Sequence, residues 1–328
     1  MEKEYAWKVC VRCMTFNHAS YIEDAINGFC MQETDFPFVC TIIDDASTDG
    51  EQEVIKRYLE EHFDLEDKTI VRNEESEDYV LTFARHKTNK NCYFAVLYLK
   101  YNHYSIKKTK IPYIAEWHEN CKYIALCEGD DYWIDGKKLQ KQVDFLEKNT
   151  GYSMCFHRAK IIKEEDFPVG LRCDDIEDRE YNPNELFKEW KVPTASIVLR
   201  HDYLEPQNVG TERILNGDIV IVLNCAKKGK IRGFSDVMSV YRVQGKGVTY
   251  DKELYNMRMM RYPGHYEFIK ENYSFIDSSL VNYKIAQAYI WRRKVQTSWI
   301  DKIKDVILAF YYKPTIFKDK LNHIVNKR

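Results

Sequence analysis

The sequence predicts an α/β protein, a parallel or mixed β-sheet flanked by helices, followed by a helical C-terminal extension. Two observations predict this class. In the first half of the 328 residues, short apolar runs typical of buried strands alternate with amphipathic helical segments. From residue 251 onward, apolar residues recur at the spacing of helices.

The first half supplies the alternating strands and helices. Strands are predicted at residues 7–16, 36–44, 68–73 and 122–127. The pair Ser20 and Glu23 has the spacing of a capping box and predicts the start of the first helix, as Thr48 and Glu51 do for the second. A further helix is predicted at 138–149, directly after the fourth strand.

The remaining segments are less regular. Residues 74–120 are polar and rich in Tyr, Lys and Asn, and we expect an inserted helical excursion there. VPTASIVLR, residues 192–200, is predicted as a strand. NGDIVIVLNCAKKGK, residues 216–230, is predicted as a helix with Asp218 at its start and Gly229 at its end.

Composition limits the classes of protein. Hydrophobic residues make up 45% and charged residues 30% of the chain, which favours neither disorder nor a membrane-spanning protein. The N-terminus lacks the apolar core of a signal peptide, so we expect a cytoplasmic protein. The ten cysteines are scattered, and reduced buried thiols are expected. The one close pair, Cys10 and Cys13, points to opposite faces of a strand, which argues against a shared metal.

Charge is distributed unevenly along the chain. Residues 251–328 hold 15 Lys and Arg against 8 Asp and Glu, a net charge of +7, so residues 1–250 hold −9 of the overall −2. An acidic body excludes nucleic acid as a main partner. In the basic tail, six apolar residues recur at helical spacing: Trp299, Ile300, Ile303, Val306, Ile307 and Phe310. Such a helix either packs on its neighbours or lies peripherally on an anionic membrane.

Three polar motifs follow predicted strands. TFNH follows the first strand, DDASTDG the second and EGDD the fourth. Each one alone is typical of a turn. Together they fall at the carboxyl ends of strands, where sheets of this class bind ligands. The carboxylates of EGDD, at Glu128, Asp130 and Asp131, raise one another's pKa unless a cation or donor offsets them.

The stretches TFNHASYIEDAI, IIDDASTDG and YIALCEGDDYW resemble the bacterial family 2 glycosyltransferases, which use nucleotide-sugars and have the GT-A fold. The resemblance covers about residues 7–250. It implies a GT-A domain over 1–250, with a nucleotide-binding half at about 1–135 and an acceptor-side half at about 136–250. Residues 251–328 are then a basic helical extension.

The resemblance also implies roles for residues. Thr15 and Asp45 would contact the base, and Asp44 would instead be a structural residue at the strand end. Of these two aspartates, Asp45 is favoured as the contact to the base. Asp130 would contact the ribose or sugar, and Asp131, with Asp130, would hold Mn²⁺ or Mg²⁺, a hard cation that offsets the charge of a leaving diphosphate. Five further donor ligands are expected: Asn17, Arg85, Glu128, Trp133 and Arg242. For Arg85 a solvated position and for Trp133 packing on the sheet are the alternatives.

Two positions depart from the family pattern. Glu128 stands where the metal-binding motif usually begins with aspartate. In DVMSVYRVQGKGV, residues 236–248, Gln244 stands where a histidine often follows the Tyr-Arg pair. Glutamine is a poor metal ligand, so Arg242 or Lys246 is left to meet phosphate charge there.

The resemblance implies an inverting glycosyltransferase. It would move a sugar from a nucleotide-sugar, with uridine the expected base, to a hydroxyl of a surface polysaccharide or lipid-linked glycan. Asp218 would be the general base, because the family's inverting members place a carboxylate at the start of the corresponding helix. Two alternatives remain open, a nucleotidyltransferase that forms nucleotide-sugars and a non-catalytic protein that binds nucleotide-sugars or glycans.

Overall fold

The structure, a computed structural model, describes residues 4–163, 172–203, 211–244, 252–316 and 318. The chain forms two compact units. The first comprises Met1–Tyr181, Trp190–Leu204 and Cys225–Val243, and the second Asn182–Glu189, Glu205–Asn224 and Gln244–Arg328. The second unit therefore takes in two segments that the sequence analysis assigned to the acceptor-side half, in addition to the predicted extension.

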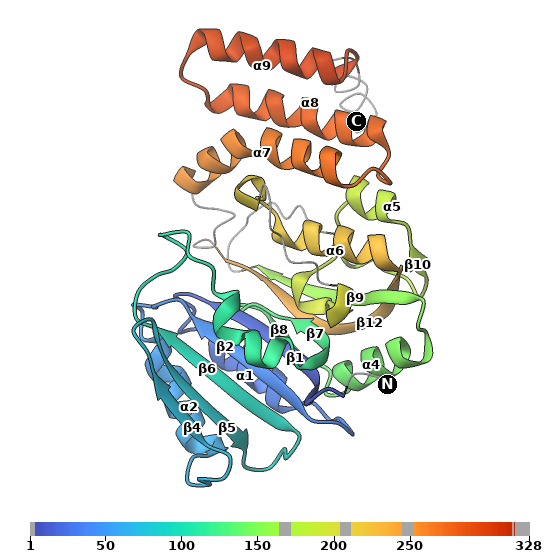
Figure 1. Cartoon of the computed structure of the whole chain (residues 1–328). Coiled ribbons are helices and arrows are strands. Elements are labelled where there is room, and N and C mark those ends of the chain that lie inside the picture. The colour runs from blue at the N-terminus through green and yellow to red at the C-terminus, as the bar shows by residue number, and fades with distance from the viewer. Residues whose placement is uncertain (1–3, 164–171, 204–210, 245–251, 317, 319–328) are drawn as a thin grey trace. The chain divides into compact units, whose positions relative to one another are not determined.

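One mixed sheet forms the centre of the first unit (Figure 1). In the described part of the chain it has 12 strands in the order β10-β12-β9-β11-β7-β1-β2-β6-β5-β3, with β4 on β5 and β8 on β12. The strands are β1 (Trp7–Thr15), β2 (Phe38–Asp44), β3 (Phe63–Asp64), β4 (Arg72–Glu75), β5 (Tyr79–His86), β6 (Cys92–Leu99), β7 (Cys121–Leu126), β8 (Tyr132–Trp133), β9 (Tyr152–Lys163), β10 (Glu180–Tyr181), β11 (Val198–Arg200) and β12 (Lys230–Val243).

The sheet is mixed, as predicted. Its central strands β7, β1, β2 and β6 run parallel to one another, and antiparallel pairs extend it on both sides. The register aligns the carboxyl ends of the central strands, since Thr15 lies opposite Asp44 and Asp44 opposite Tyr98. The loops that follow β1, β2 and β7 therefore meet at one edge of the sheet.

Short helices connect the strands. They are α1 (Ile22–Cys30), α2 (Glu51–His62), α3 (Ala115–His118), α4 (Lys138–Lys148), α5 (Pro183–Lys188) and α6 (Gly217–Lys228), with 3-10 turns η1 (Ile111–Ile114), η2 (Thr194–Ser196), η3 (His201–Tyr203) and η4 (Thr211–Arg213). The helices α1, α2 and α4 confirm the predicted segments. Their predicted caps are wrong, because α1 follows Tyr21 and α2 follows Gly50, neither with a side-chain capping bond.

The expected helical insertion at 74–120 is wrong for most of its length. The segment contains β5 and β6, and helical turns occur only at η1 and α3. The polar composition of the segment comes from its turns, whereas every residue of β6 except Tyr93 is buried. A buried strand of this kind is a continuous apolar run, and its neighbours β2 and β5 cover both of its edges.

Each C-terminal helix of the second unit packs on the next one along the chain. They are α7 (Lys252–Asn272), α8 (Ser278–Val295) and α9 (Trp299–Tyr312), with α8 in contact with both others. Asp277 caps α8 and Ser298 caps α9 through side-chain bonds to backbone N–H groups. The predicted helical extension is confirmed. Among the described residues, none of the helices has the length and apolarity to cross a membrane.

Two helical glycines, Gly28 in the first unit and Gly264 in the second, test the packing of α1 on β8. A Cβ on Gly28 in α1 would lie 2.8 Å from the backbone nitrogen of Trp133, whereas one on Gly264 in α7 would meet nothing within 4 Å. We expect Gly28→Ala to lower the free energy of unfolding by about 1–3 kcal/mol, because the new methyl group would clash with the backbone of Trp133, which moves less easily than a side chain. Gly264→Ala should raise it by up to about 1 kcal/mol. Urea unfolding of both variants measures this; equal stabilisation by both would contradict the close packing of α1 on β8.

Candidate functional site

Thr15 joins the loops that follow β1 and β2. It is the last residue of β1, and its carbonyl oxygen accepts the backbone N–H of Asp45 at 3.0 Å. Its buried hydroxyl donates to the carboxylate of Glu51 and lies 3.1 Å from Nδ1 of His18. Thr15 therefore fixes the first loop against the second.

Glu51 is a site residue that the sequence analysis treated only as part of a helix cap. Its carboxylate is fully buried and accepts bonds from Thr15 Oγ1, from the backbone N–H of His18 at 2.9 Å and from Ser47 Oγ at 2.8 Å. Burial raises the pKa of Glu51, and these donors oppose the rise. No sequence signal indicated this role, since the partners lie up to 36 residues away.

Asn17 links the same two loops from the outside. It has a positive φ of 57°, a conformation that asparagine tolerates better than most residues. Its side-chain oxygen accepts the backbone N–H of Thr48 at 2.8 Å, and its own N–H donates to Ser47 Oγ at 2.8 Å. The side chain is thus engaged in holding the loops together.

The acidic loop after β7 packs directly on Thr15. The N–H of Gly129 donates to the carbonyl oxygen of Met14 at 3.1 Å, and a Cβ on Gly129 would lie 2.1 Å from Thr15 Oγ1, so only glycine fits. Glu128 is exposed, and Oδ2 of Asp130 lies 3.8 Å from Nε2 of His18. The structure therefore brings Thr15, Asp45 and the EGDD carboxylates to one edge, with His18 among them.

Asp131 is the most constrained of these carboxylates. It is 3% exposed and accepts the backbone N–H of Arg242 in β12 at 2.8 Å. Burial, and then the charge of Asp130, raise its pKa well above the usual range of a carboxyl. A nearby cation would reverse this shift.

A metal ion at this loop would need ligands from the substrate. Among the residues that the structure describes, no three His, Cys, Asp or Glu side chains gather as metal ligands. Asp130 and Asp131 supply two carboxylates, and Mg²⁺ is commonly held by one or two carboxylates together with substrate phosphates. The donor set therefore fits a cation that arrives with a diphosphate.

Arg242 clamps the acidic loop to α1. Its Nε donates to the carbonyl oxygen of Asp130 at 3.0 Å, and its Nη2 pairs with Asp24 at 2.8 Å. The guanidinium lies 4.5 Å from the ring centroid of Tyr21, and the side chain is only 9% exposed. These contacts give Arg242 a structural task, and its predicted contact with phosphate stays a prediction. Lys246, the other predicted cation, lies outside the described residues.

Asp45 holds the loop that follows β6. Its two carboxylate oxygens accept the backbone N–H groups of His103 at 2.7 Å and Tyr104 at 3.1 Å, and Lys110 Nζ at 2.6 Å. Its side chain is only 3% exposed. The loop over residues 100–110 is thus folded onto the carboxylate that was expected to contact the base.

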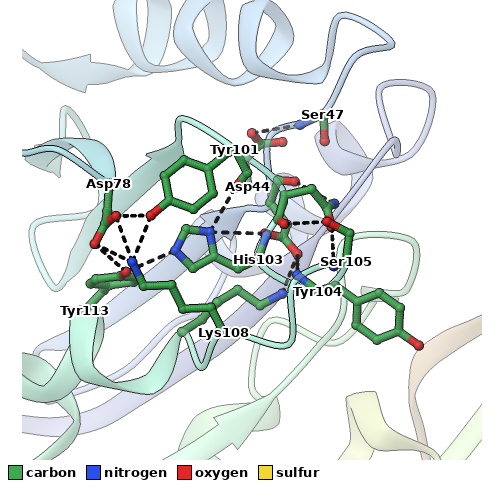
Figure 2. Close-up of polar contacts among 12 residues, drawn as sticks. Asp44, Ser47, Asp78, Tyr101, His103, Tyr104, Ser105, Lys108 and Tyr113 are labelled. Carbon is green, nitrogen blue, oxygen red and sulfur yellow. Dashed lines mark hydrogen bonds and ion pairs between the residues drawn. The ribbon is translucent and has the colours of Figure 1, made fainter.

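A second group of polar residues fixes the same loop (Figure 2). Asp78 accepts Lys108 Nζ at 2.8 Å, Tyr113 Oη at 2.7 Å and the hydroxyl of Tyr101. The buried ring of His103 lies 3.0 Å from Tyr113 Oη through Nε2 and donates from Nδ1 to the carbonyl oxygen of Tyr101 at 2.8 Å. None of these residues was predicted, because their spacing follows no recognisable motif.

Asp44 differs from Asp45 in having one carboxylate oxygen without a hydrogen-bond partner among the described residues. It is fully buried; its Oδ2 accepts Gln52 Nε2 and the N–H of Ser47, whereas Oδ1 has no partner among the described residues. Burial raises its pKa. Gln52 and Ser47 also line a cavity of about 660 Å³ beside Tyr98. Asp44 therefore remains the alternative contact for a ligand.

Two predicted residues do not lie in the site. Arg85 in β5 lies opposite Tyr93 in β6, whereas Asp44 in β2 lies opposite Tyr98 in β6. Tyr93 and Tyr98 are about 17 Å apart along β6. It lies 3.7 Å from Asp67 at the opposite edge of the sheet. Trp133 is 1% exposed, and its Nε1–H donates to the carbonyl oxygen of Ala195 at 2.8 Å. Trp133 is a core residue and cannot stack on a sugar.

Asp218 belongs to the second unit. It lies in the first turn of α6, as predicted. Burial raises the pKa of Tyr266, and the charges of Tyr262 and Asp218 add to the rise, whereas Arg258 opposes it. Gln244 is also in this unit and is buried.

The raised pKa of Asp131 leads to a test of stability against pH. The pKa of Asp131 is higher in the folded than in the unfolded protein, so folding favours the protonated carboxyl. Its full contribution to the free energy of unfolding is present below the unfolded-state pKa. That contribution is lost as pH rises through the folded-state pKa. Asparagine retains the acceptor for Arg242 and carries no charge. We expect Asp131→Asn, without metal or nucleotide, to melt at a higher temperature than wild type at pH 8, and the gain to vanish near pH 4. A gain that grows as pH falls would contradict the buried, uncompensated carboxylate.

Known proteins resemble this chain in sequence and in fold. The sequence pattern of glycosyl transferase family 2 matches residues 11–94. The uncharacterized proteins Mb1547 of Mycobacterium bovis and Rv1520 of Mycobacterium tuberculosis are each 25% identical over 262 residues, covering 77% of this chain. The chain spans 63% of the length of these relatives.

The structure of TarS shares the fold, and a second solved structure matches it less closely. The Staphylococcus aureus protein TarS, in complex with UDP-GlcNAc, matches with a TM-score of 0.50 at 12% identity, over 95% of this chain and 92% of that one. The mannosyltransferase PcManGT of Pyrobaculum calidifontis, in complex with GDP-Man and Mn²⁺, matches with a TM-score of 0.47 at 14% identity, over 97% and 92%. The family pattern runs from β1 into β6, which includes the first two loops of the site. Residues 11–94 therefore match the family 2 glycosyltransferases, and the chain shares the GT-A fold of TarS.

Proposed function

We propose that this protein is an inverting glycosyltransferase that moves a sugar from a UDP-sugar to a hydroxyl of a surface polysaccharide or lipid-linked glycan. The observation that carries the proposal is the meeting of Thr15, Asp45 and the Asp130–Asp131 pair at the carboxyl edge of β1, β2 and β7. The UDP-GlcNAc in the complex of TarS, a protein of the same fold, supports uridine as the base.

The base would bind beside Thr15 and Asp45. A carboxylate offers about four acceptor positions, and Asp45 uses three of them for the loop over residues 100–110. One position remains for an N–H of a base. Asp44, with its unpartnered Oδ1, is the second candidate for this contact. Asn17 would act by holding the two loops at the required separation.

The diphosphate would lie against the acidic loop. Asp130 and Asp131 would hold Mn²⁺ or Mg²⁺ together with phosphate oxygens, with the exposed Glu128 beside them. The cation would offset the charge that develops on the leaving diphosphate. Arg242 would keep Asp130 and Asp131 in place through its bonds to the loop and to α1.

Asp218 would accept the proton of the acceptor hydroxyl. A general base must be ionised and within hydrogen-bond reach of the proton that it takes, and such a base typically contributes 10²- to 10⁴-fold to the rate. The position of Asp218 in the first turn of α6 is also that of a helix-stabilising acid, so the two roles have to be separated by experiment.

Products separate this proposal from its alternatives. Purified protein with Mn²⁺, a panel of nucleotide-sugars and a glycan acceptor should release nucleoside diphosphate. Formation of nucleotide-sugar and pyrophosphate from a nucleoside triphosphate would indicate a nucleotidyltransferase instead. Binding without any turnover would indicate a binding protein.

The metal assignment is tested by donor binding. We expect Asp131→Asn to weaken Mn²⁺-dependent binding of UDP at least about tenfold in calorimetry, because the variant loses one of two carboxylates that hold the cation. Arg85→Ala is the control and should bind UDP as wild type does, since Arg85 lies at the other edge of the sheet. Equal affinity of wild type and Asp131→Asn, with or without metal, would rule out the metal site.

The general base is tested by an isosteric change. Asparagine stabilises a helix start about as well as aspartate but cannot take a proton. We expect Asp218→Asn to melt near wild type, to bind UDP with Mn²⁺ normally and to transfer sugar at least about a hundredfold more slowly. Transfer at the wild-type rate would assign the base to another residue and leave Asp218 as a structural acid.

A further inference from the structure

The last described helix, α9, carries a row of exposed apolar side chains. Trp299 is 75% exposed and Tyr311 is 78% exposed, and they stand near the two ends of the helix. Four more exposed large apolar residues lie between them: Ile300, Ile303, Ile307 and Phe310. We call these six residues the α9 stripe.

The α9 stripe faces away from the helices of its own unit. At 100° per residue, its six positions fall within a sector of about 120° on the helix. The buried residues of α9, Asp305 and Ala309, lie on the opposite side. Asp305 pairs there with Arg292 of α8 at 3.0 Å, so packing on α8 uses the face that the stripe does not occupy.

The charges of α9 are sorted about this stripe. By the same helical spacing, Lys302 flanks one side of the stripe and Lys304 flanks the other. The acids Asp301 and Asp305 lie on the far side of the helix. Lys304 Nζ lies 3.3 Å from Asp301 Oδ1, and such an exposed ion pair contributes little to the free energy of unfolding.

We propose that α9 lies in the plane of an anionic membrane surface. The α9 stripe would enter the boundary between headgroups and acyl chains, and the flanking lysines would reach the lipid phosphates. Trp299 and Tyr311 would sit at headgroup level, where these amphipathic rings are favoured. The basic sequence from residue 251 onward adds long-range attraction to the same surface.

A second copy of the chain fits the α9 stripe less well. Two copies joined stripe to stripe would bring the flanking lysines of one helix, Lys302 and Lys304, near those of the other. The acid Asp301, which pairs with Lys304, lies farther round the helix from the stripe. Like charges in such positions oppose association. An anionic lipid surface supplies the opposite charge on both flanks, so the membrane is the occupant that the charges favour.

The membrane contact adds a consequence to the proposed function. A transferase held in this way meets acceptors that are themselves anchored in lipid. This consequence rests on the proposed function, whereas vesicle binding does not, because it is measured without donor or acceptor. Failure of one therefore leaves the other standing.

The test is co-sedimentation of the full chain with vesicles of phosphatidylcholine, with and without phosphatidylglycerol. We expect binding only to the vesicles that contain phosphatidylglycerol, and weaker binding as salt is raised. Ile303→Ser with Ile307→Ser should weaken binding at least about tenfold. Lys302→Gln with Lys304→Gln should weaken it by a similar factor, since each lysine near an anionic surface contributes about fivefold.

A matched control is Ile106→Ser. Ile106 is 57% exposed, close to the 60% of Ile307, but belongs to the loop after β6 in the first unit. This variant should bind vesicles as wild type does. Melting temperatures of all variants should stay near wild type, because the changed side chains are exposed.

Three results would overturn the proposal. They are wild-type protein that does not bind phosphatidylglycerol vesicles, stripe variants that bind as tightly as wild type, and equal loss of binding in Ile106→Ser. Sedimentation velocity, which measures the oligomeric state, distinguishes membrane binding from dimer formation. A wild-type dimer that Ile303→Ser with Ile307→Ser dissociates, without vesicle binding, would assign the α9 stripe to a second copy.

Discussion

The bond between the Arg242 backbone and the Asp131 carboxylate is the contact on which the site depends. It holds the buried carboxyl group of Asp131 at the end of β7, beside Asp130, with an oxygen 2.8 Å from the backbone nitrogen of Arg242 in β12. The guanidinium of Arg242 then ties the same loop to α1 through Asp24. One residue thereby fixes three segments that are distant in sequence. The carboxylates stay together because the backbone and the clamp hold them, although burial and repulsion raise the pKa of Asp131.

Asp45, directly after β2, and Glu51, at the start of α2, also hold neighbouring loops together. Each is a buried carboxylate that collects three donors from other segments. Such charge-assisted bonds are stronger than neutral ones, so the loops after β1, β2 and β6 are ordered before any ligand arrives. A site arranged in advance loses less conformational entropy on binding. The buried carboxylates of Asp45 and Glu51 thus order the edge of the sheet where the donor would bind.

Much of this could be predicted from the sequence because periodicity and strand-end motifs are local. Apolar runs located β1, β2 and β7, and the polar residues after them located Thr15, Asp45 and the EGDD loop. Glu51, His103 and Lys110 could not be found, since their roles depend on partners up to 65 residues away. Arg85 was misplaced because the sequence does not show that β5 runs antiparallel to β6.

The central claim is that the carboxyl edge of β1, β2 and β7 binds a nucleotide diphosphate with a metal ion. Crystals grown with UDP and Mn²⁺, measured at the manganese absorption edge, test it most directly. The account predicts one strong anomalous peak within coordination distance of Asp130 or Asp131, about 2.0–2.6 Å, with the diphosphate bound to the same ion. A uridine nucleotide bound elsewhere, or a manganese peak remote from the acidic loop, would contradict it.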